Sequence, residues 1–163
     1  MLIIRRGCPI LGLALLVVVA GCASDGIKDY ESRGEKNLRI DARIEPNSFG
    51  SVRGSFLHVF AVSPRCELGY LGTVTLDKPT MEAGLPTDKP LLLRAEFVAR
   101  QRFSEGGTHN TYAYFVQLRP GYDYAADIQQ QERLYKFALM EKRRGGGPGR
   151  AVERKGLEQC GPK

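Results

Sequence analysis

Polar and apolar residues alternate along most of this chain, and Gly and Pro interrupt the alternation at short intervals. Alternation puts one side of a segment in a core and the other side in water, as in a β-strand with one solvated face. The clearest example is residues 91–102, where one side carries Leu91, Leu93, Ala95, Phe97 and Ala99. No segment keeps helical spacing over a comparable length, so we expect the chain to fold almost entirely into strands.

The strand pattern recurs between turn-forming residues in segments 38–44, 56–62, 72–76, 91–102, 112–118, 122–128, 134–141 and 150–155. Strands this short and closely spaced are typical of two packed sheets. We therefore predict an all-β fold, an antiparallel β-sandwich of about seven to eight strands. Residues 56–62 are apolar on both sides, which predicts a central, covered strand. Residues 81–88 are expected to form a loop or a single helical turn, and residues 129–134 another brief helical turn.

A local motif supports the sandwich. Residues 118–124 (LRPGYDY) resemble the Leu-x-Pro-Gly-x-x-Tyr segment of fibronectin type III domains, although the tryptophan usual in that module is missing. The resemblance implies that Tyr124 starts a strand and hydrogen-bonds back across the corner between the sheets. Ala126 and Ile128 continue the inward alternation. The expected architecture is therefore an immunoglobulin-like or transthyretin-like sandwich.

The N-terminus has the composition of a secretory signal. Arg5 and Arg6 are the only charges before Asp25, and residues 10–20 form an uncharged run. Crossing a bilayer takes about 20 apolar residues, so this run is too short for a stable transmembrane helix. A basic start, a short apolar run and small residues before a break indicate a signal peptide.

The break, Val19-Ala20-Gly21-Cys22, resembles the lipobox of bacterial lipoproteins. The resemblance implies lipidation of the Cys22 thiol, cleavage before this residue and acylation of the new amine. Two or more acyl chains hold a protein firmly in a membrane. Residue 23 is Ala, whereas Asp there favours inner-membrane retention in this family, so the resemblance implies an outer-membrane address facing the periplasm. The alternative is an ordinary signal peptide with an incidental cysteine.

The sequence thus divides into a signal peptide (residues 1–21), a lipidated cysteine with a flexible tether (22–37) and a sandwich domain (38–163). The tether is predicted because residues 23–37 are polar and lack apolar periodicity, although a binding segment is the alternative. Cys66 and Cys160 are the remaining mature cysteines, and thiols in an oxidising periplasm usually pair. We expect a disulfide between them, with two buried free thiols as the alternative.

After residue 21, the excess of basic over acidic residues lies entirely within residues 141–163. The candidate binding residues of this basic C-terminal hairpin are Arg143, Arg144, Arg150 and Arg154. A periplasmic protein meets no nucleic acid, so the partners in question are anionic lipid headgroups, lipopolysaccharide or an acidic protein. The alternative is a solvated hairpin whose basic side chains protect a sheet edge.

The sequence contains no recognisable catalytic or cofactor motif. Of the two histidines, His58 alternates with phenylalanines and is expected to be a hydrogen-bonded core residue, and His109 is expected in an exposed polar loop. Cys66 and Cys160 are too far apart in sequence for the close spacing of a zinc site. Asp123 and Asp127 on one strand would be about 13 Å apart, too far for a carboxylate pair. We predict that the protein is not an enzyme and uses no cofactor or metal, with a hydrolase of unrecognised site as the alternative.

The function predicted from these features is that of a non-enzymatic, lipid-anchored protein of the cell envelope, whose sandwich domain binds another envelope component. Two alternatives remain open: a binding module for anionic glycolipid or peptidoglycan, and an accessory lipoprotein of a secretion system such as type VI. The second rests on similarity of layout alone.

Overall fold

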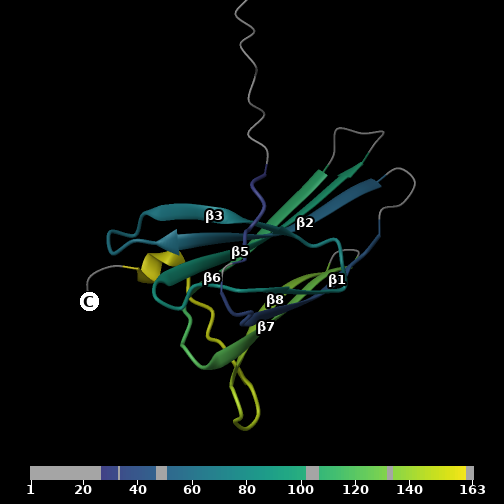
Figure 1. The fold of residues 1–163 in the computed structure, drawn as a ribbon. Coiled ribbons are helices and arrows are strands. Elements are labelled where there is room, and N and C mark those ends of the chain that lie inside the picture. The colour runs from purple at the N-terminus through teal and green to yellow at the C-terminus, as the bar shows by residue number, and fades with distance from the viewer. Residues whose placement is uncertain (1–26, 33, 47–50, 102–106, 132–133, 161–163) are drawn as a thin grey trace, which may run out of the picture.

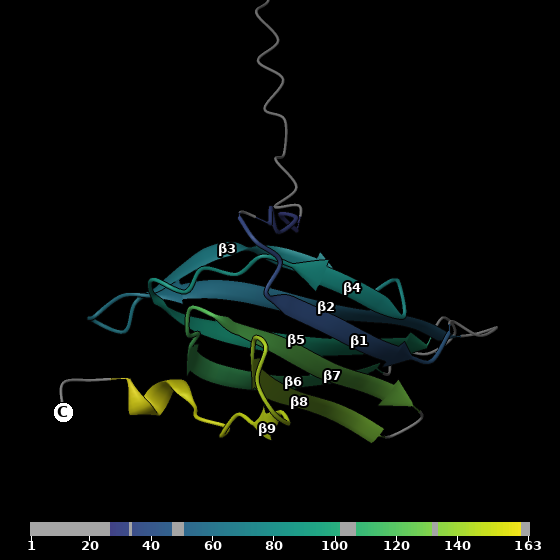
Figure 2. The same ribbon diagram turned by 60° about the horizontal axis from the view of Figure 1, so that its bottom comes forward.

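The computed structural model describes residues 27–32, 34–46, 51–101, 107–131 and 134–160 (Figure 1). Two sheets pack face to face, which confirms the predicted all-β sandwich (Figures 1 and 2). The four-stranded sheet has the order β3 (Leu68–Thr75), β2 (Ser51–Val62), β5 (Pro90–Gln101) and β6 (Gly107–Gln117). The five-stranded sheet has the order β4 (Thr80–Ala83), β1 (Leu38–Ile44), β7 (Tyr122–Gln131), β8 (Leu134–Arg143) and β9 (Arg150–Ala151). A 3-10 helix, η1 (Leu157–Gln159), follows β9.

The apolar side of each strand fills the space between the sheets. In β5 the predicted inward residues Leu91, Leu93, Ala95 and Phe97 are completely buried. From the opposite sheet they meet a similar set, which includes Leu38, Ile40, Ala126, Ile128 and Leu139. The alternation of the sequence therefore determines which side of each strand faces the core.

The expectation of a wholly antiparallel sandwich is wrong at one pair. Strands β1 and β7 run parallel, with Leu38 opposite Tyr124 and Ile44 opposite Gln130. A tight hairpin would enforce antiparallel pairing, but β1 and β7 are separated by most of the domain, so no turn restricts their relative direction.

Three local predictions are also corrected. Part of residues 81–88 forms the edge strand β4, because Thr80–Ala83 pairs with β1 instead of coiling. Residues 129–131 continue β7 and Leu134 begins β8, so the described part of residues 129–134 contains no helical turn. Of residues 150–155 only Arg150–Ala151 form a strand, so the predicted hairpin is a pairing of β8 with a two-residue β9.

Residues predicted as a flexible tether contact the sandwich. The backbone oxygen of Lys28 accepts a hydrogen bond from Thr73 N at 2.8 Å, and the Tyr30 hydroxyl donates to Gly84 O at 2.8 Å. This approach requires glycine at position 72, because a Cβ there would lie 2.6 Å from Tyr30 Cα. Asn37 is buried and exchanges two side-chain hydrogen bonds with the Leu85 backbone. The chain is therefore attached to the domain from Lys28 onward.

No helix in the part of the chain that the structure describes is long and apolar enough to cross a membrane. The predicted signal peptide and Cys22 lie outside the described residues, so lipidation of Cys22 stays a prediction.

Candidate binding face

Alternate residues of the four-stranded sheet point away from the core and form its outer face. The register places His58 of β2 between Thr73 of β3 and Arg94 of β5, and Glu96 of β5 opposite Thr111 of β6. This surface is called the aromatic face below, and its members are Val52, Phe56, His58, Phe60, Tyr70, Arg94, Glu96, His109 and Thr111. Residues 56–62 were predicted to form a central, covered strand, and β2 does lie between β3 and β5 with none of these residues exposed. The described residues form two layers of strands, however, and no described strand lies over the outer side of β2 (Figures 1 and 2).

Aromatic rings of β2 and β3 follow one another along this face. The ring centroids of Phe60 and Tyr70 are 5.3 Å apart, and those of Phe56 and His58 are 6.1 Å apart. The guanidinium carbon of Arg94 lies 5.0 Å from the Phe60 ring centroid, which is a cation–π contact. Tyr70 is exposed and Phe56 and Phe60 are half-buried, so the rings present a contiguous apolar surface to solvent.

Glu96 binds both histidines of the chain, one through each carboxylate oxygen. Oε2 is 2.8 Å from Nε2 of His58, and Oε1 is 3.0 Å from Nε2 of His109. Burial raises the pKa of the Glu96 carboxyl, but the hydrogen bonds from His58 and His109 outweigh that effect, so the pKa lies below its ordinary value of 4.5. Glu96 therefore remains a carboxylate at neutral pH and links β2, β5 and β6.

The network continues through the second ring nitrogen of His58 toward β3. Nδ1 of His58 lies 2.5 Å from Thr73 Oγ1, which lies 2.5 Å from the Tyr70 hydroxyl. Tyr70 in turn donates to Lys28 O at 3.3 Å. Both ring nitrogens of His58 therefore take part in hydrogen bonds, Nε2 with Glu96 and Nδ1 with Thr73. Polar contacts thus hold the His58 ring and the Tyr70 hydroxyl in place.

The arrangement does not provide an accessible nucleophile. Glu96, His58 and Thr73 follow the carboxylate, base and hydroxyl order of nucleophilic enzymes. Thr73, however, is only 1 % exposed and its hydroxyl is also bound by Tyr70, so a substrate cannot reach it. Within the described ranges, no group of three or more His, Cys, Asp and Glu side chains is placed to hold a metal ion. The chemistry of this face is hydrogen bonding and ring stacking, and the absence of enzymatic activity stays a prediction.

Three of the four predicted C-terminal arginines have partners within the domain, namely Arg144, Arg150 and Arg154. Arg144 forms ion pairs with Glu35 and with Asp123, the latter at 2.7 Å. Hydrogen bonds to Glu35 and Asp123 raise the pKa of the Arg144 guanidinium, which is cationic at any physiological pH in either case. Arg144 therefore links residue 35 to the start of β7.

Two of the other arginines also bind within the domain. Arg150 and Arg119 both contact the Glu141 carboxylate, at 2.5 and 2.6 Å, and Arg154 lies 5.1 Å from the centroid of the Tyr112 ring. Arg143, at the end of β8, is exposed. The predicted anion site thus consists mainly of cations that already have partners.

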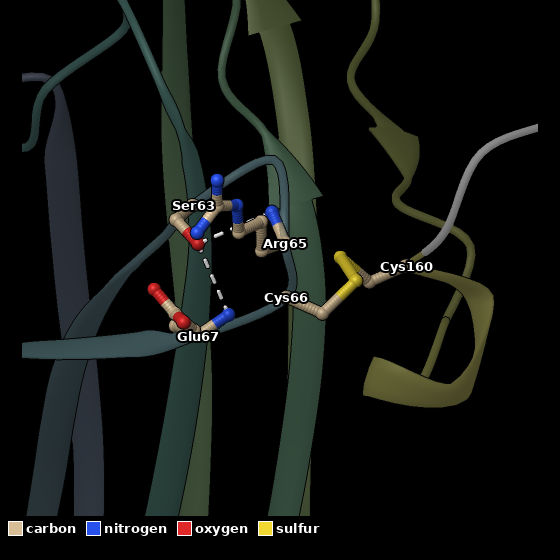
Figure 3. Close-up of a disulfide and its surroundings, with 5 residues drawn as sticks. All are labelled: Ser63, Arg65, Cys66, Glu67 and Cys160. Atoms are coloured by element: carbon tan, nitrogen blue, oxygen red, sulfur yellow. Dashed lines mark hydrogen bonds between the residues drawn. A yellow bond between two sulfur atoms is a disulfide. The ribbon is translucent and has the colours of Figure 1, made fainter.

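The C-terminal segment (residues 150–160) connects the two sheets. Val152 N donates to Leu139 O of β8 at 2.8 Å, and Lys155 O accepts from Phe115 N of β6 at 2.8 Å. At its end Cys160 is bonded to Cys66, which is the disulfide expected from the sequence (Figure 3). The segment therefore closes one edge of the sandwich and is covalently fixed to the turn between β2 and β3.

That turn presents Cys66 through its own hydrogen bonds. Ser63 Oγ accepts from Arg65 N at 3.2 Å and from Glu67 N at 3.1 Å, as the dashed lines in Figure 3 show. Cys66 has a positive φ of 64°, uncommon for a residue other than glycine. The tight turn directs its side chain toward Cys160 (Figure 3).

The expected tyrosine-corner contact is present. Tyr124 is buried at the start of β7, and its hydroxyl accepts a hydrogen bond from Arg119 N at 2.8 Å. This bond fixes the Pro-Gly turn that leads from the four-stranded sheet into the five-stranded sheet.

The network centred on Glu96 was not predicted from the sequence. His58 is buried and hydrogen-bonded as expected, but it points outward, and His109 belongs to β6 instead of a loop. The available signal was the polar residues on the outward side of the apolar strands. Their meeting depends on the register of β2, β5 and β6, which periodicity within one strand does not specify.

Comparisons with protein-family models, curated proteins and solved structures find no match to this chain.

Proposed function

We propose that this protein is a lipid-anchored, non-enzymatic component of a bacterial cell envelope, and that its sandwich binds another envelope component through the aromatic face. The anchor is proposed from the signal-like N-terminus and the lipobox ending at Cys22. Acyl chains on Cys22 would hold the protein in the membrane without a spanning helix. Ala23 favours the outer membrane, with the domain in the periplasm.

The observation that supports the binding role is the aromatic surface on β2, where Phe56 and Phe60 are half-buried and Arg94 lies over the Phe60 ring. Contiguous apolar surface on a soluble domain commonly marks an interaction site. Phe, Tyr and Arg are also the residues that dominate the centres of protein interfaces, and Arg94 stacks on Phe60 here. Because the Glu96 network holds the polar groups of the face in fixed positions, little side-chain entropy is lost when a partner docks.

A position-specific crosslinking experiment tests the binding role. A photoreactive phenylalanine analogue replaces Phe60 in the full chain, and a control carries it at Met140 on the outer side of the five-stranded sheet. Irradiation of intact cells should yield one reproducible adduct at position 60 and none at 140. Equal adducts at the two positions, or none at 60, would contradict the proposal.

The anchor has its own test. The intact mass of the membrane-extracted protein, measured with and without reductant, reports the cleavage site, the added acyl mass and the disulfide together. The proposal requires a chain that begins at Cys22 and carries acyl chains. A product that retains Met1 would remove the anchor and the envelope location.

An anionic glycan or lipid ligand held by the C-terminal arginines is a weaker candidate. Arg144, Arg150 and Arg154 are already engaged by Glu35, Glu141 and Tyr112 respectively. A ligand would have to displace these contacts before it could bind.

A further inference from the structure

The described chain begins at one edge of the sandwich. Lys28 O accepts hydrogen bonds from Thr73 N and from the Tyr70 hydroxyl, both of β3. The chain then passes β4, where Tyr30 donates to Gly84 O and Lys36 pairs with Glu82. Figures 1 and 2 show this purple segment beside β3 before it enters β1. The first described residues therefore lie along the edge formed by β3 and β4.

Exposed apolar side chains gather at the β3 side of this edge. Ile27 is 54 % exposed, Leu68 42 % and Tyr70 41 %, and together they make up half of the large hydrophobic residues exposed in the described ranges. Leu68 lies opposite Val62 and Tyr70 opposite Phe60, so both point to the outer side of the sheet. Tyr70 has an exposed ring with a hydroxyl bound to the backbone, the amphipathic form that suits a membrane–water interface.

The distance to the proposed anchor is short. Ile27 is five residues after Cys22, and five residues span at most about 18 Å when fully extended. A tether ending at residue 37 would let the domain move freely, but the contacts of Lys28, Tyr30 and Asn37 remove that freedom. If acyl chains hold Cys22 at the bilayer surface, the β3 edge cannot move far from the headgroups.

We propose that the β3 edge rests on the membrane that carries the anchor, with Ile27, Leu68 and Tyr70 in the interfacial layer of the lipid. This inference rests on the proposed lipidation of Cys22. In this orientation the edge with β3 and β4 faces the membrane. Strands β6 and β9, at the opposite edges of their sheets, lie farthest from it. The rest of the aromatic face, on β2, β5 and β6 with Phe60, Glu96 and His109, then points sideways and remains open to a partner. A lipid surface explains apolar exposure next to the chain entry point, which a distant protein partner would not require.

The chain contains no Trp, so a single introduced indole reports its own surroundings. The probe variant is Leu68→Trp, and the matched control is Met140→Trp, since Met140 is 38 % exposed and lies on β8 in the other sheet. Both full-length, lipidated proteins are placed in vesicles of phosphatidylethanolamine and phosphatidylglycerol with or without brominated acyl chains. Bromine quenches indole fluorescence only at close range. Tyr70→Trp provides a second probe in case Leu68→Trp disturbs the fold.

We expect brominated lipid to lower the Leu68→Trp emission at least threefold more than the Met140→Trp emission, and Tyr70→Trp to follow Leu68→Trp. Equal quenching of probe and control, or quenching of neither, in protein whose intact mass shows the acyl chains would overturn the inference. A spectral shift of the probe that depends on protein concentration and not on bromine would identify a second copy as the occupant and also overturn it. Protein without acyl chains in the mass spectrum refutes the proposed anchor, a result separate from the quenching.

Discussion

The two outer faces of this sandwich use opposite ways of meeting solvent. On the five-stranded sheet, charged side chains neutralise one another within and between strands: Arg39 pairs with Asp41 at 2.9 Å, and Asp127 lies 3.0 Å from Arg43 and 2.7 Å from Lys136. On the four-stranded sheet the aromatic face surrounds one carboxylate that is shared by two histidines. Both faces arise because side chains alternate between the core and the outer side of each strand. The face with paired charges, on the five-stranded sheet, is the better solvated of the two.

The difference bears on where the proposed partner would dock. A face of paired, hydrated charges costs desolvation energy to bury, so it disfavours docking. A face of rings and half-buried polar groups has already lost much of its water, so docking costs less there. The proposed partner contact is therefore expected on the four-stranded sheet, and the outer face of the five-stranded sheet is expected to stay in contact with water. The following experiments test that division.

The largest loss of stability is expected from removing the disulfide between Cys66 and Cys160, because it joins the C-terminal segment to the four-stranded sheet. Cys66→Ser removes the bond to Cys160, whose closed loop spans a sequence separation of 94. The chain-entropy estimate for a loop of that size is about 4.7 kcal/mol. We expect chemical denaturation to show a loss of stability approaching that value. A loss below about 1 kcal/mol would mean that the C-terminal segment is held mainly by its hydrogen bonds to β6 and β8.

The next largest loss of stability is expected from breaking the hydrogen-bond network around Glu96 in the aromatic face. His58→Ala leaves Glu96 and Thr73 each without one buried hydrogen-bond partner. The penalty for such groups is about 1–3 kcal/mol. His109→Ala is the matched control, because His109 also binds Glu96 but is exposed, and it should lose much less. Equal losses for the two variants in urea denaturation would show that burial of this network contributes nothing.

A smaller effect should depend on pH. The pKa of Glu96 is lowered in the folded protein, so its ionised form contributes stability that is complete above the ordinary value of 4.5 and is lost on acidification through the lowered value. Glu96→Gln should therefore lower stability by about 1 kcal/mol at pH 7, and the difference should shrink below pH 4. The measurement is thermal unfolding of both proteins from pH 7 to pH 3. A difference that stays constant over this range would contradict the assigned role of the carboxylate.

The smallest change in stability is expected on the outer face of the five-stranded sheet, where the charged side chains pair with one another. Burial raises the pKa of Asp127, but hydrogen bonds from Lys136, Gln129 and Arg43 outweigh it and lower the pKa to about 2. The stabilising contribution is thus complete above the ordinary value of 3.8 and disappears as the pH falls through about 2. Because this cluster is partly solvated, Asp127→Asn should cost less than about 1 kcal/mol at pH 7 and less still in high salt. A larger, salt-independent loss would show that the two faces do not differ as described.

Much of the fold could be predicted because the relevant information is local. Strand β1 has the predicted limits, and the inward set of β5 follows directly from alternation, since side chains on a strand switch sides at each residue. The pairing of Cys66 with Cys160 needed only the number of cysteines left after the proposed lipidation and an oxidising compartment. Tyr124 was found because its Pro-Gly turn is adjacent in sequence.

What the tertiary structure decided is which distant residues meet. No local pattern specifies that β1 runs parallel to β7, that Thr80–Ala83 pairs with β1, or that Arg144 binds Glu35. The same holds for Glu96, whose partners come from β2 and β6, on either side of β5. Periodicity determines the side of the sheet on which a residue lies, whereas contacts across a sheet depend on strand order and register. Those are selected by the packing of the whole core, so the sequence indicated a sandwich, and only the assembled sheets revealed its candidate binding face.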